Sequence, residues 1–190
     1  MRIIGGKFKG KKLFFLNSKV TRPLRDRVKE NLFNIIKHSN LIDVSIKNSS
    51  VLDLYSGIGS FGLECVSREA KKVTFVEENK NVLEVLNKNV ILINKSKNKA
   101  SINIYPGKIK TFFKNIKKNY KFDIIFFDPP FLDKEFIDHL YFFKKQGLYS
   151  KKHLVILHRE SNAADNLKII INVIKEKKYG RSKIIIGKFN

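Results

Sequence analysis

Val51-Leu52-Asp53-Leu54-Tyr55-Ser56-Gly57-Ile58-Gly59-Ser60-Phe61-Gly62 is the stretch that decides the fold of this chain. Its apolar beginning follows three polar residues and predicts a buried strand. The glycines that follow have the spacing G-x-G-x-x-G, and residues 63–67 continue as a predicted helix. A strand, a glycine turn and a helix in this order are typical of a Rossmann-like nucleoside site, because glycines permit a sharp turn and the close approach of a ligand.

Two carboxylates indicate which nucleoside cofactor this site would hold. Glu77 ends the next predicted strand, at about the separation expected for an acid that binds ribose hydroxyls. Asp53 precedes the first glycine, where it would repel the pyrophosphate of a dinucleotide. S-adenosylmethionine has no phosphate, and its sulfonium and ammonium groups suit a carboxylate. The pattern D-x-x-x-G-x-G therefore favours a methyltransferase over a nicotinamide-dependent oxidoreductase. The alternative is that Asp53 only caps a helix or loop.

Composition sets the outer limits of the interpretation. The chain has 190 residues, of which 43% are hydrophobic, so one α/β domain with a packed core is expected. The single cysteine, Cys65, excludes a disulfide framework or a cysteine-based zinc site within the chain, and no metal is expected. No apolar run approaches a membrane span, and the first residues do not read as a secretory segment. We therefore expect a cytoplasmic protein that does not bind membranes.

Charge points to an anionic partner. Lys and Arg number 39 against 17 Asp and Glu, which gives a formal net charge of +22. Such an excess usually indicates nucleic acid, although a merely soluble charged surface is the alternative. Residues 1–20 are predicted to form a small hairpin with a basic tip, docked on a main domain at 21–190, because they carry too little apolar surface to fold alone. The alternative is a frayed basic tail. The cations expected to contact RNA phosphates are Arg2, Lys7, Lys9, Lys11, Lys12 and Arg22.

Beyond the glycine stretch, strand-like and helix-like runs alternate. Strands are predicted at 72–76, 102–105, 122–127, 154–157, 168–173 and 183–186, and helices at 25–37, 79–94, 108–117 and 134–145. This alternation predicts an α/β fold with a mostly parallel, doubly wound sheet and ligands at the carboxyl ends of its strands. The last two strands are expected to form a hairpin through Tyr179-Gly180, so that an antiparallel strand closes the sheet.

Asp128-Pro129-Pro130-Phe131 is the second chemical signal, directly after the apolar strand at 122–127. The prolines stop the strand and stiffen the turn, which fixes the carboxylate and nearby carbonyls as acceptors. Acceptors beside the flat Phe131 ring suit a planar base with an exocyclic amine. They can draw a weakly nucleophilic amine towards tetrahedral geometry and position it for a methyl group. Taken alone, D-P-P-F is more simply read as an ordinary strand stop. Together with the glycine stretch, it favours a catalytic set of Asp128, Pro129, Pro130 and Phe131.

The sequence resembles the RsmD family of bacterial 16S rRNA guanine-N2 methyltransferases. D-P-P-F after an apolar strand is shared by many amino-group methyltransferases, whereas the N-terminal stretch is more specific. The matching stretches are 1–13, 21–23, 26–34, 51–62, 63–68, 73–77, 128–131 and 179–180.

The resemblance implies a Rossmann-like class I methyltransferase fold with S-adenosylmethionine as methyl donor. It implies that the acceptor is the N2 amine of a guanine in 16S rRNA, within the small ribosomal subunit or its late precursor, and we expect a monomer. The cofactor residues expected from the resemblance and the glycine loop are Asp53, Tyr55, Ser56, Gly57, Gly59, Glu77 and Asp128.

One position departs from the family pattern. Gly107-Lys108 stands where the family usually has Gly-Asp, so we expect adenine to be read by backbone and apolar groups. Three other functions stay open on the sequence alone: an amino-methyltransferase acting on DNA or another RNA, a non-catalytic RNA-binding assembly factor, and a nicotinamide-dependent oxidoreductase.

Overall fold

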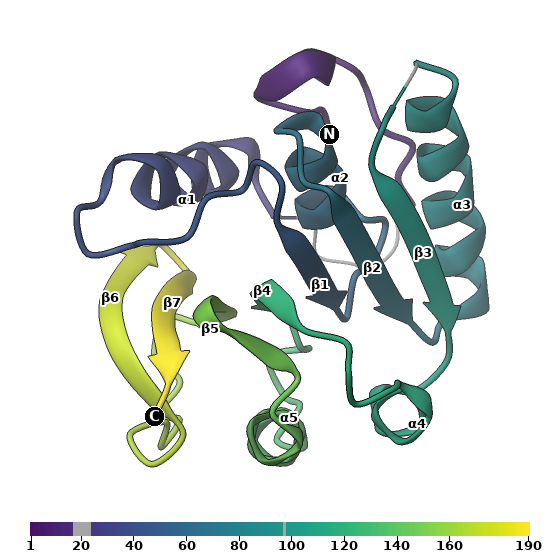
Figure 1. Cartoon of the computed structure of the whole chain (residues 1–190). Helices are drawn as coiled ribbons and strands as arrows, with labels where there is room; N and C mark the ends of the chain where they lie inside the picture. The colour runs from purple at the N-terminus through teal and green to yellow at the C-terminus, as the bar shows by residue number, and fades with distance from the viewer. Residues whose placement is uncertain (17–23, 97) are drawn as a thin grey trace.

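A computed structural model describes residues 1–16, 24–96 and 98–190, and its centre is a seven-stranded sheet with the order β3-β2-β1-β4-β5-β7-β6 (Figure 1). The strands are β1 Ser50–Leu54, β2 Lys72–Glu77, β3 Ser101–Pro106, β4 Phe122–Phe127, β5 Tyr149–Glu160, β6 Ile171–Tyr179 and β7 Ser182–Phe189. The first five strands are parallel, and β7 lies antiparallel between β5 and β6. The predicted α/β class with an antiparallel closure is therefore confirmed.

Helices cover both faces of the sheet. They are α1 Asp26–His38, α2 Ser60–Ser67, α3 Lys80–Asn94, α4 Ile109–Asn115 and α5 Phe136–Gln146. One buried cluster joins α1, α2 and α3 to the sheet, and a second joins α4 and α5 to the opposite face. Residues 124–127 of β4 form an unbroken apolar run because both sides of the strand are covered: Ile124 and Phe126 enter the first cluster, whereas Ile125 and Phe127 enter the second.

The C-terminal hairpin is longer than its apolar pattern predicts. Residues 168–170 lie in a turn, and β6 runs through the lysine-rich residues 175–178, which we expected to form a connection. The backbone of this segment pairs with β7, and its side chains are exposed because β6 is the edge of the sheet. Exposed lysines on an edge strand discourage pairing with other chains, so their presence is compatible with a strand.

The N-terminal segment, residues 1–16, folds back on itself and docks on α1 and α2. Its arms meet at an isolated bridge between Arg2 and Lys12, and a 3-10 helix, Gly6–Phe8, forms the turn in place of a regular hairpin. The side chains of Ile3 and Leu13 are buried in the first core cluster. The predicted boundary between residues 20 and 21 lies outside the described residues, as does Arg22.

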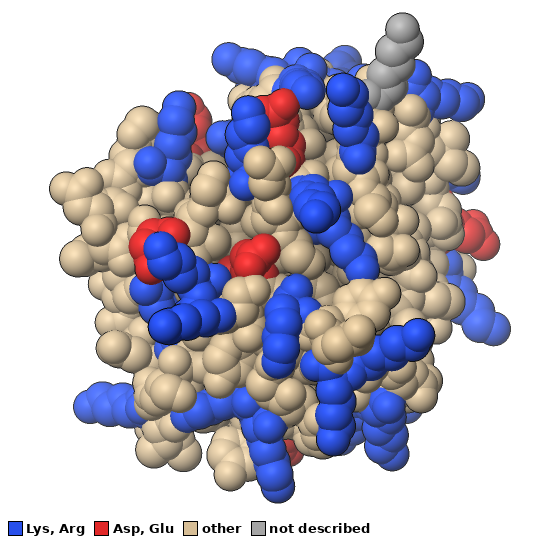
Figure 2. Space-filling model, in the orientation of Figure 1, with Lys and Arg blue, Asp and Glu red and all other residues tan. Residues whose placement is uncertain are grey.

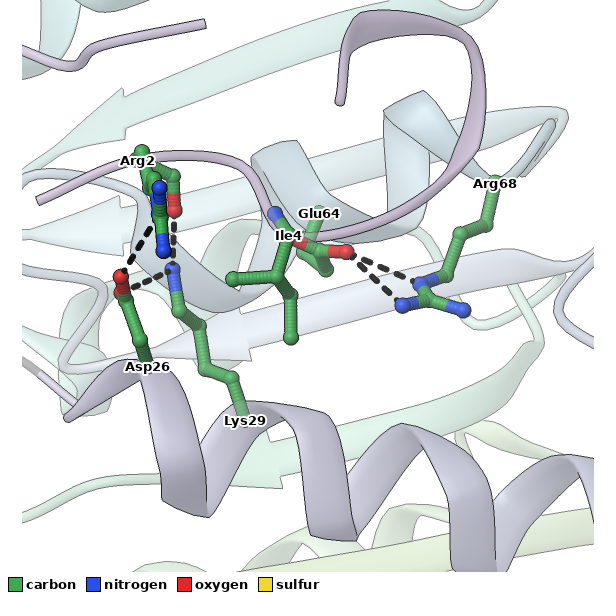
Figure 3. A network of polar contacts seen from close by, with 6 residues as sticks. All are labelled: Arg2, Ile4, Asp26, Lys29, Glu64 and Arg68. Carbon is green, nitrogen blue, oxygen red and sulfur yellow. Dashed lines mark hydrogen bonds and ion pairs between the residues drawn. The ribbon is translucent and has the colours of Figure 1, made fainter. Parts of the chain in front are cut away.

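Buried polar contacts hold this segment in place (Figure 3). The backbone N–H of Ile4 donates to Glu64 Oε2 at 2.9 Å, and Glu64 is also paired with Arg68. The ammonium group of Lys29, which is fully buried on α1, donates to the carbonyl of Arg2 at 2.6 Å. Burial lowers the pKa of Lys29, and the nearby acids Glu64 and Asp26 oppose that shift. Detaching the segment would remove partners from the buried charges of Lys29 and Glu64. Because buried charges without partners are costly, these contacts hold the segment against α1 and α2.

The turn of the segment lies at the amino end of the sheet. The backbone N–H of Phe8 donates to Ser67 Oγ at 2.9 Å, and Ser67 is the last residue of α2. In Figure 1 this turn is at the top, whereas the heads of the β1, β2 and β3 arrows point away from it. Lys7 and Lys9 are therefore far from the carboxyl ends of the strands.

Candidate functional site

A cavity of about 990 Å³ opens at the carboxyl ends of β1, β2 and β4. Ligand pockets of this kind usually measure about 300–1,000 Å³, so this one has room for a nucleoside and a base. The following predicted site residues line it: Asp53, Tyr55, Ser56, Gly57, Glu77, Asp128, Pro129, Pro130 and Phe131. The two motifs, which lie far apart in the sequence, are thus brought to one cavity. Gly59 and the described residues among the predicted RNA contacts do not line it.

Left-handed backbone shapes the turn between β1 and α2. Gly57 has φ 55° and open space where a side chain would be, so a ligand can approach its backbone. Gly59 has φ 85°, and an added Cβ would lie 2.6 Å from Leu86 Cδ1, so this glycine serves helix packing. Tyr55 has φ 56°, which costs a residue with a side chain about 1–3 kcal/mol. Its hydroxyl forms a 2.7 Å hydrogen bond with His139 Nδ1, which helps to hold that conformation.

Asp53 has a structural role as well as a place in the cavity wall. Its Oδ2 accepts a hydrogen bond from the backbone N–H of Gly62 at 2.9 Å. It therefore caps one of the first N–H groups of α2, as the alternative interpretation expected. Burial raises the pKa of Asp53 well above its ordinary value, and the nearby Asp128 and Glu77 charges act in the same direction. A cation in the cavity would favour the ionised carboxylate.

Glu77 is bound by backbone donors on two sides. Its Oε2 accepts from the N–H of Gly57 at 2.8 Å, and its Oε1 accepts from the N–H groups of Glu78 and Asn79 at 3.0 and 2.9 Å. The carboxylate thus joins the glycine turn to the beginning of α3. A carboxylate offers about four acceptor positions, so a ribose hydroxyl would take the remaining one or replace a backbone donor.

Residues that sequence reasoning missed hold the D-P-P-F loop. His158 Nδ1 lies 2.8 Å from Asp128 Oδ1, and Arg159 donates to the carbonyls of Pro130 and Phe131 at 3.2 and 3.4 Å. Both residues follow the apolar run at 154–157, at the same carboxyl edge as Asp128. Their position at the end of a buried strand was the sequence signal that could have identified them.

Three buried polar atoms of the cavity wall lack a hydrogen-bond partner among the described residues. They are Ser56 Oγ, Ser60 Oγ and His139 Nε2. Buried polar atoms are nearly always paired in folded proteins, so these point to a polar ligand. Lys108, at the position that departs from the family pattern, also lines the cavity.

Two solved structures identify the class of protein to which this fold belongs. The "Putative methyltransferase yhhF" of Escherichia coli has a structure with TM-score 0.82 and 27% identity, covering 100% of this chain and 98% of that one. The "putative methylase HI0767" of Haemophilus influenzae gives TM-score 0.77 and 29% identity over 100% and 98% of the two chains. The fold is therefore that of a Rossmann-like class I methyltransferase.

The chain belongs to the family described as "Conserved hypothetical protein 95", whose model matches residues 1–188. A Haemophilus influenzae relative named "Ribosomal RNA small subunit methyltransferase D" is 42% identical over 131 residues, which confirms the resemblance to the RsmD family. That match covers 69% of this chain and 64% of the relative, so it spans less than two thirds of the relative's length. In the described parts of the chain, none of the helices has the length and apolar character to cross a membrane.

Proposed function

We propose that the protein transfers a methyl group from S-adenosylmethionine to the N2 amine of a guanine in 16S rRNA, within the small ribosomal subunit or its late precursor. One observation carries the proposal: the glycine-loop acids Asp53 and Glu77 line the same cavity as Asp128-Pro129-Pro130-Phe131. The name of the Haemophilus influenzae relative supports ribosomal RNA of the small subunit as the substrate.

The cavity wall fits the cofactor chemically. When bound, S-adenosylmethionine supplies an electrophilic methyl group on a positively charged sulfur. Asp53 would offer negative charge to the cationic groups, and Glu77 would accept from ribose hydroxyls. The Ser56 and Ser60 hydroxyls, which lack a partner in the described parts of the chain, would provide further polar contacts within the same wall. A dinucleotide would place its pyrophosphate near Asp53, so the oxidoreductase alternative is disfavoured.

The D-P-P-F loop would bind and orient the target base. Asp128 and the carbonyl of Pro129 would accept the two hydrogens of the exocyclic amine and turn its lone pair towards the methyl group. The half-buried Phe131 would provide a stacking face for a base taken out of its helix. No base needs to deprotonate the amine before transfer, because these acceptors already reduce its delocalisation into the ring.

A basic surface supports a nucleic acid partner. The net charge is +22, and Lys and Arg side chains are spread over the face shown in Figure 2 with few acidic ones among them. Arg2, Lys7, Lys9, Lys11, Lys12 and Arg22 remain the RNA contacts that we propose. We further propose that the protein acts as a monomer and that it acts in the cytoplasm, where its proposed ribosomal substrate is assembled.

The test is transfer of a tritiated methyl group to purified small subunits, protein-free 16S rRNA and DNA, followed by analysis of the labelled nucleoside. We expect label in N2-methylguanine of the small subunit or its precursor, and none with Asp128→Ala. Label in DNA or in methyladenine would replace the proposed acceptor with the alternative amino-methyltransferase. Absence of label from every acceptor, with RNA binding intact, would favour an assembly factor instead.

A further inference from the structure

Two consecutive residues at the end of β5 contact the D-P-P-F loop from the side of the sheet. His158 is 3% exposed and Arg159 is also 3% exposed, although both are polar. The register between β4 and β5 pairs Phe127 with Leu157, so the two residues that follow them in the chain also lie side by side. Those residues are Asp128 and His158.

His158 controls one oxygen of the Asp128 carboxylate. Its Nδ1 lies 2.8 Å from Oδ1, and because an ionised carboxylate only accepts, Nδ1 carries the hydrogen and donates. The imidazole also meets the Phe131 ring edge to face, with 6.0 Å between ring centroids. None of the described residues donates a hydrogen bond to Oδ2, so that oxygen is the one available to an incoming amine. The contact therefore fixes both the rotation of the carboxylate and the ring beside it.

Arg159 fixes the rest of the loop. Its guanidinium donates to the carbonyls of Pro130 and Phe131, and it forms a two-point ion pair with Asp165 at 2.9 and 3.3 Å. It also stacks over the Phe136 ring at 4.0 Å from the centroid. Because these two carbonyls are occupied, the acceptors left for a substrate are Asp128 Oδ2 and the carbonyl of Pro129.

We propose that His158 and Arg159 are positioning residues for methyl transfer, which aim Oδ2 of Asp128 and the carbonyl of Pro129 at the target amine. This inference rests on the proposed function. His158 acts through Asp128 and Arg159 through the backbone of the loop, and neither forms a hydrogen bond or ion pair with the described residues of the glycine turn. Their loss should therefore slow the transfer step and leave cofactor affinity unchanged.

The experiment compares His158→Asn, His158→Leu and His158→Gln with the wild type. Asparagine can place an N–H donor near the position of Nδ1, leucine keeps most of the volume without a donor, and glutamine places its amide beyond that position. Loss of a hydrogen bond to a charged group corresponds to a rate lower by about 10- to 100-fold, and we expect that loss in kcat for the leucine and glutamine variants. The asparagine variant should stay within about threefold of wild type. The Kd for S-adenosylmethionine, measured by calorimetry, should be equal in all variants. That result would show that the cofactor site is folded in each of them.

Arg159→Lys provides an independent variant, because three donors on one ammonium nitrogen cannot reproduce the four contacts that the planar guanidinium makes with Asp165 and two carbonyls. We expect a lower kcat with unchanged cofactor Kd. Equal kcat for wild type, His158→Leu and His158→Gln would overturn the inference while the proposed function stands. A lower kcat in all three His158 variants, asparagine included, would also overturn it, because the donor would not be the cause. If the wild type transfers no methyl group to any acceptor, the proposed function fails, and with it this inference.

Discussion

Glu77 Oε2 accepts a hydrogen bond from the backbone N–H of Gly57 at 2.8 Å, which joins the end of β2 to the glycine turn after β1. The other oxygen, Oε1, accepts from the N–H groups of Glu78 and Asn79, directly before α3. The residue expected to bind ribose is therefore also the residue that holds the two loops around the cofactor cavity. Its substitution should affect both properties.

Glu77→Ala should weaken S-adenosylmethionine binding about tenfold or more and lower thermal stability. The weaker binding follows from the loss of charge-assisted hydrogen bonds, worth about 1.5–3 kcal/mol, and the lower stability from three N–H groups left without an acceptor. Calorimetry and thermal unfolding measure the two effects. The exposed neighbour Glu78 is the matched control, since its alanine variant should change neither. If Glu78→Ala lost the affinity instead, the assignment of the ribose contact to Glu77 would be wrong.

Asp53→Asn should separate charge from hydrogen bonding. Asparagine keeps an oxygen for the N–H of Gly62, so stability should be retained. Loss of the negative charge should weaken binding of the cationic cofactor about tenfold, which calorimetry measures.

Because burial raises the pKa of Asp53, the folded chain holds a proton here at pH values where the unfolded chain has lost it. The contribution of Asp53 to stability therefore falls as pH rises from its ordinary pKa through the raised one.

The same residue links cofactor binding to protons. A bound cation favours the ionised carboxylate, so binding should release a proton at pH values below the raised pKa of Asp53. Calorimetry in two buffers of different ionisation enthalpy measures that release, which Asp53→Asn should abolish. Equal proton release in the variant and the wild type would show that another group is responsible.

His153 should make the fold sensitive to acid. Its Nδ1 donates to the carbonyl of Ser150 at 2.9 Å, and its Nε2 accepts from the N–H of Phe189 at 2.9 Å, an arrangement that requires a neutral ring. Burial lowers its pKa, so this contribution is complete above the unfolded value of about 6.5 and is lost as pH falls below it. Urea unfolding between pH 7.5 and 5 should show a loss of at most about 1.4 kcal/mol per pH unit from this residue.

His153→Gln tests that origin, because its amide can both donate and accept without titrating. The variant should lose a smaller part of its free energy of unfolding than the wild type over the same pH range. His139, whose pKa burial also lowers, remains in the variant and should preserve some acid sensitivity. An unchanged pH dependence would assign the whole effect to other groups.

The main lines of the fold could be predicted because local pattern and tertiary environment agree. The apolar run at 124–127 is buried on both faces, as its lack of alternation indicated, and Asp128 follows it at the edge where parallel strands present ligand-binding groups. Asp53 and Glu77 could be placed at that edge for the same reason. The exposed residues 175–178 could not be read as a strand, because backbone pairing with β7 and not side-chain burial places them there.

The contacts of His158 and His139 depend on tertiary structure. His158 faces Asp128 only because β5 pairs with β4 in one register, which no local motif encodes. His139 lies among Phe136, Leu140 and Phe143 on α5, so its spacing resembled that of an ordinary core position. Its contact with Tyr55 joins residues 84 positions apart. Sequence patterns identified which strand ends carry chemistry, whereas register and helix packing decided which side chains meet.

The proposed RNA contacts of the N-terminal segment divide into two groups. Lys7 is paired with Glu69 at 2.8 Å, Arg2 with Asp26 at 3.2 Å, and Lys11 contacts the Ser96 hydroxyl. Lys9 and Lys12 are exposed and form no ion pair with a described residue. These two lysines should therefore supply more of the phosphate binding than the cations that already have a partner.

Asn89 connects the same segment to the cofactor loop. It is fully buried on α3, where its side chain accepts from the N–H of Phe14 and donates to the carbonyls of Phe14 and Ile58. Ile58 lies inside the glycine turn. The segment thus has one region suited to RNA and another that supports the cofactor site, which allows the two roles to be separated by substitution.

Replacing both Lys9 and Lys12 with alanine should weaken binding to 16S rRNA and leave S-adenosylmethionine affinity unchanged. Each lost phosphate contact should reduce the slope of log K against log salt concentration by about 0.7–0.9. Lys7→Ala and Lys11→Ala serve as matched controls and should have smaller effects, since their ammonium groups already have partners in the protein. Asn89→Ala should show the reverse pattern, with weaker cofactor binding and a nearly unchanged salt slope. Filter binding at several salt concentrations and calorimetry measure the two quantities. Loss of cofactor affinity in the Lys9 and Lys12 double variant would show that the exposed lysines support the cavity, and the RNA-docking role would have to be abandoned.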